Sequence, residues 1–262
     1  AHRLSDLNRP FSYRQNPPAM PAKRKAAKSA PGDLKKVDSS APVWLEKAMS
    51  HANLISPKNA EMEDKPDSPK KQASVMSPSH FDPYTMNLKV KSDFPKVLPA
   101  FIEVAGQSRN KYEWDHDLGC LVLDRVLHSA VFYPQSYGFF SQTLCGDGDP
   151  LDVLVMNTSP LMPGSTVFVR PLCYMIMEDE KGMDEKVLAV SSNDAHYYDF
   201  KTFEDIPGHV LREISQFFET YKALEQDKWA KIGGWKGTAE TYKLIEETHQ
   251  TYLETTKAMQ SP

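Results

Sequence analysis

The sequence has few cysteines and no long apolar run. Its three cysteines, Cys120, Cys145 and Cys173, are odd in number and lack metal-ligand spacing, so we expect a reducing compartment rather than a disulfide framework. The apolar runs are much shorter than the roughly 18 residues of a membrane-spanning helix, so no membrane span is expected. The sequence also lacks a P-loop, a Rossmann fingerprint and a nucleophile elbow, which disfavours the usual nucleotide hydrolysis and covalent serine chemistry.

Charge and proline are distributed unevenly along the chain. The formal net charge is -4 over 262 residues, yet residues 1–80 hold 14 Lys+Arg against 8 Asp+Glu. The same residues hold 10 of the 20 prolines but one of the four tryptophans. Burial of so few apolar side chains does not offset the entropy lost on ordering. We therefore expect a linker-like extension at 1–80, with a short amphipathic helix at 40–55, and a folded domain at 81–260.

The sequence from about residue 84 onward predicts strands first and helices last. Short apolar or alternating segments bounded by turns predict strands at 98–106, 110–117, 119–127, 151–156, 165–177 and 185–191. Apolar side chains then recur at helical spacing at 208–226 and 238–256. This order indicates the α+β class, most simply a small closed antiparallel β-barrel with helices packed on it.

The segment DGDPLDVLV, residues 147–155, places three carboxylates at the start of an apolar strand. Two carboxylates about 4 Å apart repel by roughly 4 kcal/mol at an effective dielectric near 20. Gly148 permits a tight bend and Pro150 favours an extended Asp149, so Asp147 and Asp149 flank one turn. Asp152 lies one step into the strand, where an unpaired carboxylate is costly. This position favours a cation site over the simpler alternative, a solvated acidic turn.

The kind of cation follows from the ligands. An EF-hand does not fit, because the acids fall at positions 1, 3 and 6 of the loop and Thr158 stands where the bidentate glutamate belongs. Carboxylate oxygens without His or Cys favour Mg²⁺ or Mn²⁺ over zinc. A second acidic turn, MEDEKGMDEK at 177–186, supplies further oxygens, enough in total for more than one divalent ion.

Basic side chains in equally apolar segments are candidate ligands for an anion. Lys111 lies in KYEW, Arg125 in LVLDRVL and Lys222 after Tyr221 on the first predicted helix. Each also has an ordinary interpretation as a member of an ion pair or a snorkelling side chain. Together with the acidic turns, they lead to the hypothesis of a metal-dependent enzyme that acts on a phosphorylated anion.

An ordered series of motifs resembles one known family. DGDPLDVLV resembles the signature of the soluble inorganic pyrophosphatases of the first family, and the similarity extends through most of residues 84–258. The flanking pieces occur in the family's order and spacing: FIEV, KYEW, LDRVLHSAVFYPQSYGF, EDEKGMDEK, FFETYK and KWAKIGGW. The resemblance implies an OB-type closed antiparallel barrel with peripheral C-terminal helices, with residues 81–260 as the catalytic domain. It implies hydrolysis of diphosphate to two phosphates and says nothing of residues 1–80.

The resemblance also implies roles for individual residues. Asp147, Asp152 and Asp184 would hold the metals that activate water, Asp179 would help to bind those that arrive with substrate, and Asp149 would be the general base. The supporting carboxylates would be Glu103, Glu113 and Glu180. Contacts to the phosphates and the leaving group would come from Lys111, Arg125, Tyr133, Tyr137, Lys186, Tyr221 and Lys222, with Lys111, Arg125 and Tyr137 also taking part in catalysis.

Cofactor, partners and location are further expectations from the resemblance. Mg²⁺ would be the cofactor, with Mn²⁺ or Zn²⁺ as substitutes and Ca²⁺ as an inhibitor. The chain would be a soluble intracellular homo-oligomer without nucleic acid. It would reside in the cytoplasm, or in an acidocalcisome, the acidic organelle that stores calcium and polyphosphate, if it is a protist form with an N-terminal extension.

Two other hypotheses stay open at this point. An OB-type barrel could bind single-stranded nucleic acid, which needs a basic groove with stacking aromatics. Residues 81–262 carry 17 Lys+Arg against 27 Asp+Glu, which argues against such a groove. The acidic turns could instead bind calcium in a purely structural or scaffolding protein.

Overall fold

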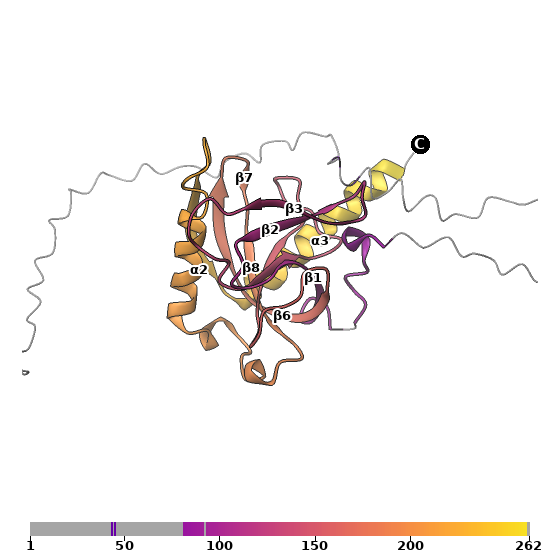
Figure 1. Cartoon of the computed structure of the whole chain (residues 1–262). Helices are drawn as coiled ribbons and strands as arrows, with labels where there is room; N and C mark the ends of the chain where they lie inside the picture. Colours follow the sequence, from indigo (N-terminus) through magenta and orange to yellow (C-terminus); the bar gives the residue numbers. More distant parts are fainter. Residues whose placement is uncertain (1–42, 44, 46–80, 92, 261–262) are drawn as a thin grey trace, which may run out of the picture. The chain divides into compact units, whose positions relative to one another are not determined.

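The computed structural model describes residues 43, 45, 81–91 and 93–260 (Figure 1). The expected extension at 1–80 and its helix at 40–55 lie outside the described residues, apart from Val43 and Leu45, which are both helical. Leu45 is fully buried in a cluster with Leu144 and Tyr252. The boundary at residue 81 therefore stays a prediction. None of the described helices is both long and apolar enough to cross a membrane.

Five strands form a hydrogen-bonded ring. Strand β1 (Leu98–Val104) pairs with β4 (Ser136–Phe139), β4 with β5 (Asp152–Met156), and β5 with β8 (Lys186–Ser191). Strand β8 pairs with the long β6 (Thr166–Asp179), which pairs back with β1. This ring, with the helices later in the sequence, confirms the predicted OB-type α+β fold.

The expectation of an entirely antiparallel barrel is wrong at one pair. Strands β5 and β8 run parallel, with Asp152 opposite Lys186. A closed ring of five strands cannot alternate in direction all the way round, because five is odd, so one neighbouring pair has to be parallel. The parallel pair places the first residues of both strands at the same end of the barrel.

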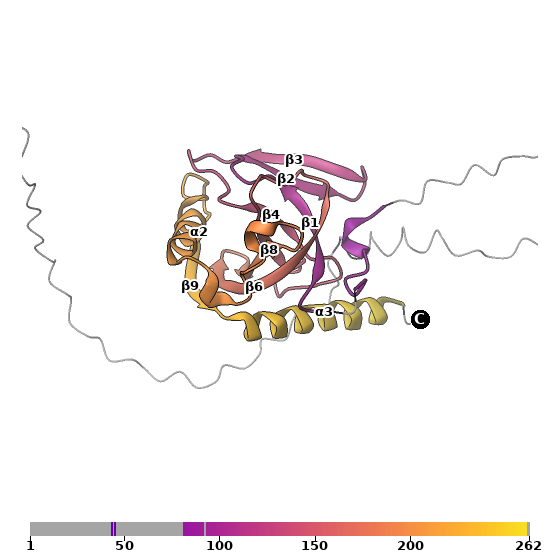
Figure 2. The ribbon, with the colours of Figure 1, turned by 90° about the horizontal axis from the view of Figure 1, so that it is seen from below.

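The remaining elements surround the ring. Strands β2 (Asn110–Asp115) and β3 (Cys120–Val126) form a separate two-stranded hairpin, while β7 (Gly182–Met183) and β9 (Ala230–Lys236) pair with β6. Helix α2 (Gly208–Thr220) packs on β9, and α3 (Thr238–Gln260) packs on β6. The 3₁₀ turns η1, η2 and η3 span Pro83–Thr85, Ala195–Tyr197 and Phe203–Asp205. In Figure 2, α3 lies along one side of the barrel and the β2–β3 hairpin lies on the opposite side.

The six predicted strands and both helices are present, but the prediction missed three strands. Strands β4 and β9 each contain glycine, which is unfavourable in a strand interior, and β7 has two residues. Helix α2 ends at Thr220, earlier than the predicted residue 226. The three cysteines are free, as expected.

The ring strands are buried on both faces. In β5, Val153 and Val155 pack in one cluster with Ile245 of α3, whereas Leu154 and Met156 pack in another with Phe218 of α2. Apolar side chains therefore pack on both faces of these strands, and this accounts for the nearly continuous apolar sequence of β5 and β8.

The contact between α3 and the barrel predicts a pH dependence of stability. His249 is 4% exposed, and its Nδ1 lies 2.7 Å from the carbonyl oxygen of Gln142. Burial, with a smaller effect of nearby Lys89, lowers the pKa of His249. The unfolded chain therefore binds a proton more readily than the folded one below about pH 6.5, and stability falls as the pH decreases through that value.

When the pH is lowered from 8 to 5.5, the Tm of His249→Gln is therefore expected to fall less than the Tm of the unsubstituted protein. The measurement is Tm by circular dichroism at both pH values. His209→Gln is the control, because the His209 side chain is 72% exposed. An equal Tm loss in all three proteins would show that His249 does not contribute to the pH dependence.

Candidate active site

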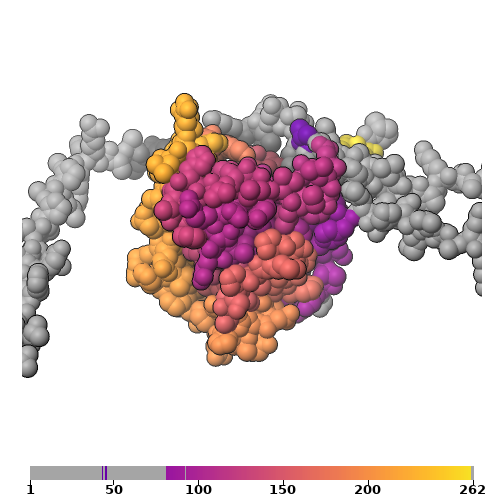
Figure 3. All heavy atoms as spheres, viewed as in Figure 1, coloured from indigo at the N-terminus to yellow at the C-terminus, as the bar shows by residue number. Residues whose placement is uncertain are grey.

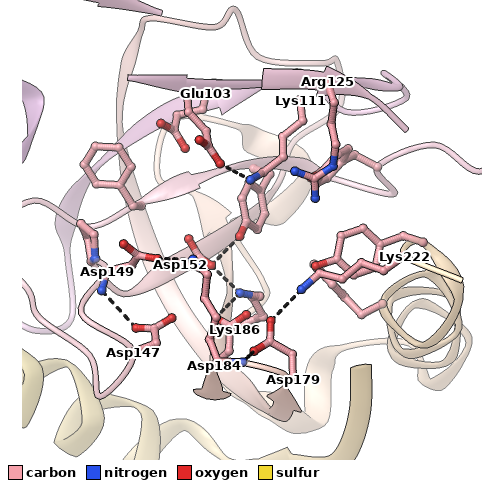
Figure 4. Close-up of a pocket in the computed structure, with 18 of the residues that line it drawn as sticks. Glu103, Lys111, Arg125, Asp147, Asp149, Asp152, Asp179, Asp184, Lys186 and Lys222 are labelled. Carbon is pink, nitrogen blue, oxygen red and sulfur yellow. Dashed lines mark hydrogen bonds and ion pairs between the residues drawn. The ribbon is translucent and has the colours of Figure 1, made fainter. Parts of the chain in front are cut away.

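The fifteen side chains predicted from the sequence all line one cavity of about 300 Å³ (Figure 4). They come from the ring strands, the β2–β3 hairpin, the segment between β3 and β4, the two acidic turns and the residues directly after α2. The set consists of Glu103, Lys111, Glu113, Arg125, Tyr133, Tyr137, Asp147, Asp149, Asp152, Asp179, Glu180, Asp184, Lys186, Tyr221 and Lys222.

The parallel pair β5–β8 joins the two acidic turns into one site. Lys186 is 2% exposed, and its Nζ donates to both Asp152 and Asp184. Burial alone would lower the pKa of Lys186, but the two carboxylates raise it well above its usual value. Tyr137 also donates its hydroxyl to Asp152. A charged ammonium group therefore lies between two carboxylates from separate parts of the sequence.

The DGD turn has the predicted bend. Gly148 adopts a φ of 90°, and the backbone N–H of Asp149 donates to Asp147 Oδ1 at 3.1 Å. Burial, followed by repulsion from Asp149 and Asp184, raises the pKa of Asp147 to about 7 against the effect of that hydrogen bond. The Asp149 side chain is 55% exposed and lies 3.5 Å from Lys181 Nζ. Of the two acids, Asp147 is the one held in the wall, while Asp149 faces the mouth of the cavity.

A second group of ion pairs connects β6 with the end of α2. Lys222 Nζ donates to Asp179 Oδ2 at 2.6 Å, and the backbone N–H of Lys181 donates to Oδ1 at 2.8 Å. Burial would raise the pKa of Asp179, but these hydrogen bonds lower it below its usual value. The next residue, Glu180, accepts from Lys228 Nζ at 2.5 Å and lies 3.7 Å from Lys222. Asp179 is thus a carboxylate held ionised at neutral pH.

The β2–β3 hairpin and β1 form another wall. Lys111 and Arg125 are opposite each other in the hairpin, and Lys111 donates to Glu113. Glu103 of β1 is 6% exposed and accepts from the backbone N–H of Trp114 at 3.0 Å. Burial raises the pKa of Glu103 to about 8, so this carboxyl is mostly protonated at neutral pH in the absence of a cation.

Several lining residues were missed by the sequence analysis. Lys181 lies in the second acidic turn, for which the sequence analysis considered the carboxylates and Lys186 but not this lysine. Lys228 belongs to KWAKIGGW, one of the motifs that resemble the family, so its membership of that motif could have marked it as a site residue. Tyr84 of η1 packs on Phe139, with 4.4 Å between the two ring centroids. It lies before the first predicted strand, where no local motif marks it.

The charge balance defines what the cavity can accept. Eight carboxylates and six basic side chains line it, a net charge of -2 if all are ionised. In the described part of the chain, no three His, Cys, Asp or Glu side chains are grouped closely enough to hold a metal ion, and Lys186 lies between Asp152 and Asp184. The donors are nevertheless hard oxygens whose repulsion a divalent ion would relieve. The chemistry of such a site suits a small polyanion bound together with metal ions.

Comparison with known proteins identifies the family. Residues 100–253 match the family model described as inorganic pyrophosphatase. The inorganic pyrophosphatase of Campylobacter jejuni is 45% identical over 171 residues, which cover 64% of this chain and 99% of that protein. The one of Thermus thermophilus is 50% identical over 152 residues, 57% of this chain and 87% of that protein. The chain belongs to the inorganic pyrophosphatase family and is a hydrolase of diphosphate.

Solved structures agree with this assignment. The crystal structure of inorganic pyrophosphatase from Thermus thermophilus has a TM-score of 0.63 at 43% identity, and covers 65% of this chain and 98% of that chain. An N-terminally truncated vacuolar soluble pyrophosphatase of Trypanosoma cruzi has a TM-score of 0.57 at 22% identity, a level at which the similarity shows the fold alone.

Proposed function

We propose that this enzyme hydrolyses diphosphate with Mg²⁺ bound in the cavity and with Asp149 as the general base. The observation that carries the proposal is the division of charges within one cavity: an excess of carboxylates gathers on the two acidic turns, and cations line the hairpin and the end of α2. Diphosphate brings three to four negative charges, so a cavity of net charge -2 can admit it together with divalent ions as counter-charge.

The carboxylates of the acidic turns would hold the metal. Asp147, Asp152 and Asp184 would be ligands, and Asp179 would bind ions that arrive with the substrate. When bound, Mg²⁺ would lower the pKa of a water molecule and offset the repulsion among the carboxylates. Lys186 would then exchange its two carboxylate contacts for a phosphate oxygen. Mn²⁺ and Zn²⁺ are proposed substitutes and Ca²⁺ an inhibitor.

The chain's own groups would bind and orient the substrate and move the proton. Asp149 would accept the proton of the attacking water, for which its exposed position at the mouth suits it. Tyr133 and Tyr137 would flank the substrate and its leaving group, and the supporting carboxylates Glu103, Glu113 and Glu180 would hold the lysines or bound waters. The negative charge that develops on the departing phosphate would be stabilised by the basic side chains Lys111, Arg125, Lys186 and Lys222, with Tyr221 as a further donor.

Removing the metal tests this proposal in two ways. Chelation is expected to stop phosphate release from diphosphate, Mg²⁺ to restore it, and added Ca²⁺ to inhibit it again. Without substrate, Mg²⁺ at about 100 times its Kd should stabilise the fold by about 2.7 kcal/mol. This corresponds to a Tm increase of roughly 5–10 °C for a domain of this size.

The same Tm measurement distinguishes the proposed ligands from other acids. Asp184→Asn should lose most of the Mg²⁺-dependent increase, because it removes a carboxylate ligand. Asp199→Asn, which changes an exposed acid outside the cavity, should retain it. Full phosphate release in the presence of excess chelator would overturn the metal requirement.

A further inference from the structure

The side chain of Arg125 is held from two directions. Its Nη1 donates to the neighbouring carboxylate of Asp124, and its Nε donates to Glu225 Oε1 at 3.1 Å. Within the described residues, the remaining terminal nitrogen, Nη2, makes no hydrogen bond to protein. Arg125 also lines the cavity, and its side chain is 26% exposed. The guanidinium group is therefore fixed on two edges, with its third nitrogen left for a ligand.

Glu225 reaches Arg125 from a distant part of the sequence. It lies 100 positions further along the chain, in the turn that follows α2, and its side chain is 9% exposed. Glu225 does not line the cavity itself. A carboxylate this buried is costly without a partner, and Arg125 is the partner it has. The two carboxylates raise the pKa of Arg125 although burial alone would lower it.

We propose that Glu225 is a positioning residue for diphosphate hydrolysis: it fixes the orientation of the Arg125 guanidinium so that Nη2 faces the substrate phosphate. The proposal rests on the role proposed above for Arg125 in phosphate binding. Glu225 itself does not touch the substrate and acts through Arg125.

The same contact ties two parts of the site together. The β2–β3 hairpin, which carries Lys111 and Arg125, is a separate sheet outside the barrel ring. The turn after α2 follows directly on Tyr221 and Lys222, and Figure 3 shows it beside the hairpin on the same face of the molecule. A second link between these parts is the hydrogen bond from Ser129 Oγ to the carbonyl oxygen of Tyr221 at 3.3 Å. Glu225 thus sets the spacing between the phosphate-binding groups on the hairpin and those directly after α2.

A double-mutant cycle tests the proposal in the full-length enzyme with Mg²⁺. Glu225→Ala is expected to lower kcat/KM for diphosphate about tenfold, the effect of losing a hydrogen bond between charged groups. Glu225→Gln should lose less, because its amide oxygen still accepts from Nε. In the Arg125→Gln background, Glu225→Ala should reduce kcat/KM by less than about twofold, because the group it positions is already gone.

The controls separate positioning from a structural effect. Glu219→Ala removes an exposed acid of α2 that does not line the cavity and should leave kcat/KM unchanged. Tm is measured for each variant. An equal loss of kcat/KM on Glu225→Ala with and without Arg125, or equal losses for the Ala and Gln variants, would overturn the positioning role. Full activity of Arg125→Gln would instead overturn the proposed phosphate contact of Arg125, and with it the role of Glu225.

Discussion

Asp149→Asn is expected to reduce kcat for diphosphate hydrolysis by about a thousandfold, the usual contribution of a general base. The amide keeps the size of the side chain but cannot accept the proton of the attacking water at neutral pH. The turn should be preserved, because the backbone N–H of residue 149 still donates to Asp147. The measurement is steady-state phosphate release with saturating Mg²⁺ and diphosphate.

Asp147→Asn, two positions away, is the matched comparison. Asp147 is the more buried of the two acids and is proposed as a metal ligand, so its substitution should reduce the Mg²⁺-dependent increase in Tm. Asp149→Asn should leave that increase nearly intact. If Asp149→Asn retained full turnover, another group would have to be the base.

Gly138→Ala is expected to prevent stable folding. A Cβ atom at this position in β4 would lie 1.8 Å from the carbonyl oxygen of Phe101 and 2.8 Å from its carbonyl carbon. Both atoms belong to the backbone of β1, the strand that pairs with β4, so the clash cannot be relieved by moving a side chain. Relief requires separation of β1 from β4, at a cost of more than about 4 kcal/mol. That is a large part of the stability of an ordinary domain, which is about 5–15 kcal/mol.

The yield of folded protein and its Tm by circular dichroism measure this effect. Gly208→Ala is the control, because the nearest atom to the added Cβ is the end of the flexible Arg212 side chain at 3.5 Å. At the first residue of α2, alanine should leave Tm unchanged or slightly raised. A Gly138→Ala protein with the original Tm would contradict the close approach of β1 and β4.

Gly138 also illustrates why some strands could be predicted from the sequence and others could not. Strands β5 and β8 were predictable because apolar side chains fill both of their faces. Strand β4, SYGF, was not, because glycine counts against a strand in propensity, whereas here it is required for two backbones to pass closely. The glycines of β9 had the same effect on its prediction.

For the candidate site, the sequence predicted the acids and bases but not their mutual contacts. The acidic turns and the motif series contain the fifteen cavity residues within short segments. Glu225 has no such signal, because its significance depends on a side chain 100 positions away. The contact of Lys186 with Asp152 likewise depends on strand pairing, which local patterns do not specify.

The parallel pairing of β5 and β8 also has a consequence for the stage of folding at which the active site is assembled. Asp152 and Lys186 are separated by 34 positions, and the intervening chain includes all of β6. We expect non-local pairs of this kind to form late in folding, because the loop entropy is lost before the contact is gained. A chain whose β6–β7 turn and DGD bend have already formed, but whose β5 and β8 are still apart, therefore has both acidic turns and no active site.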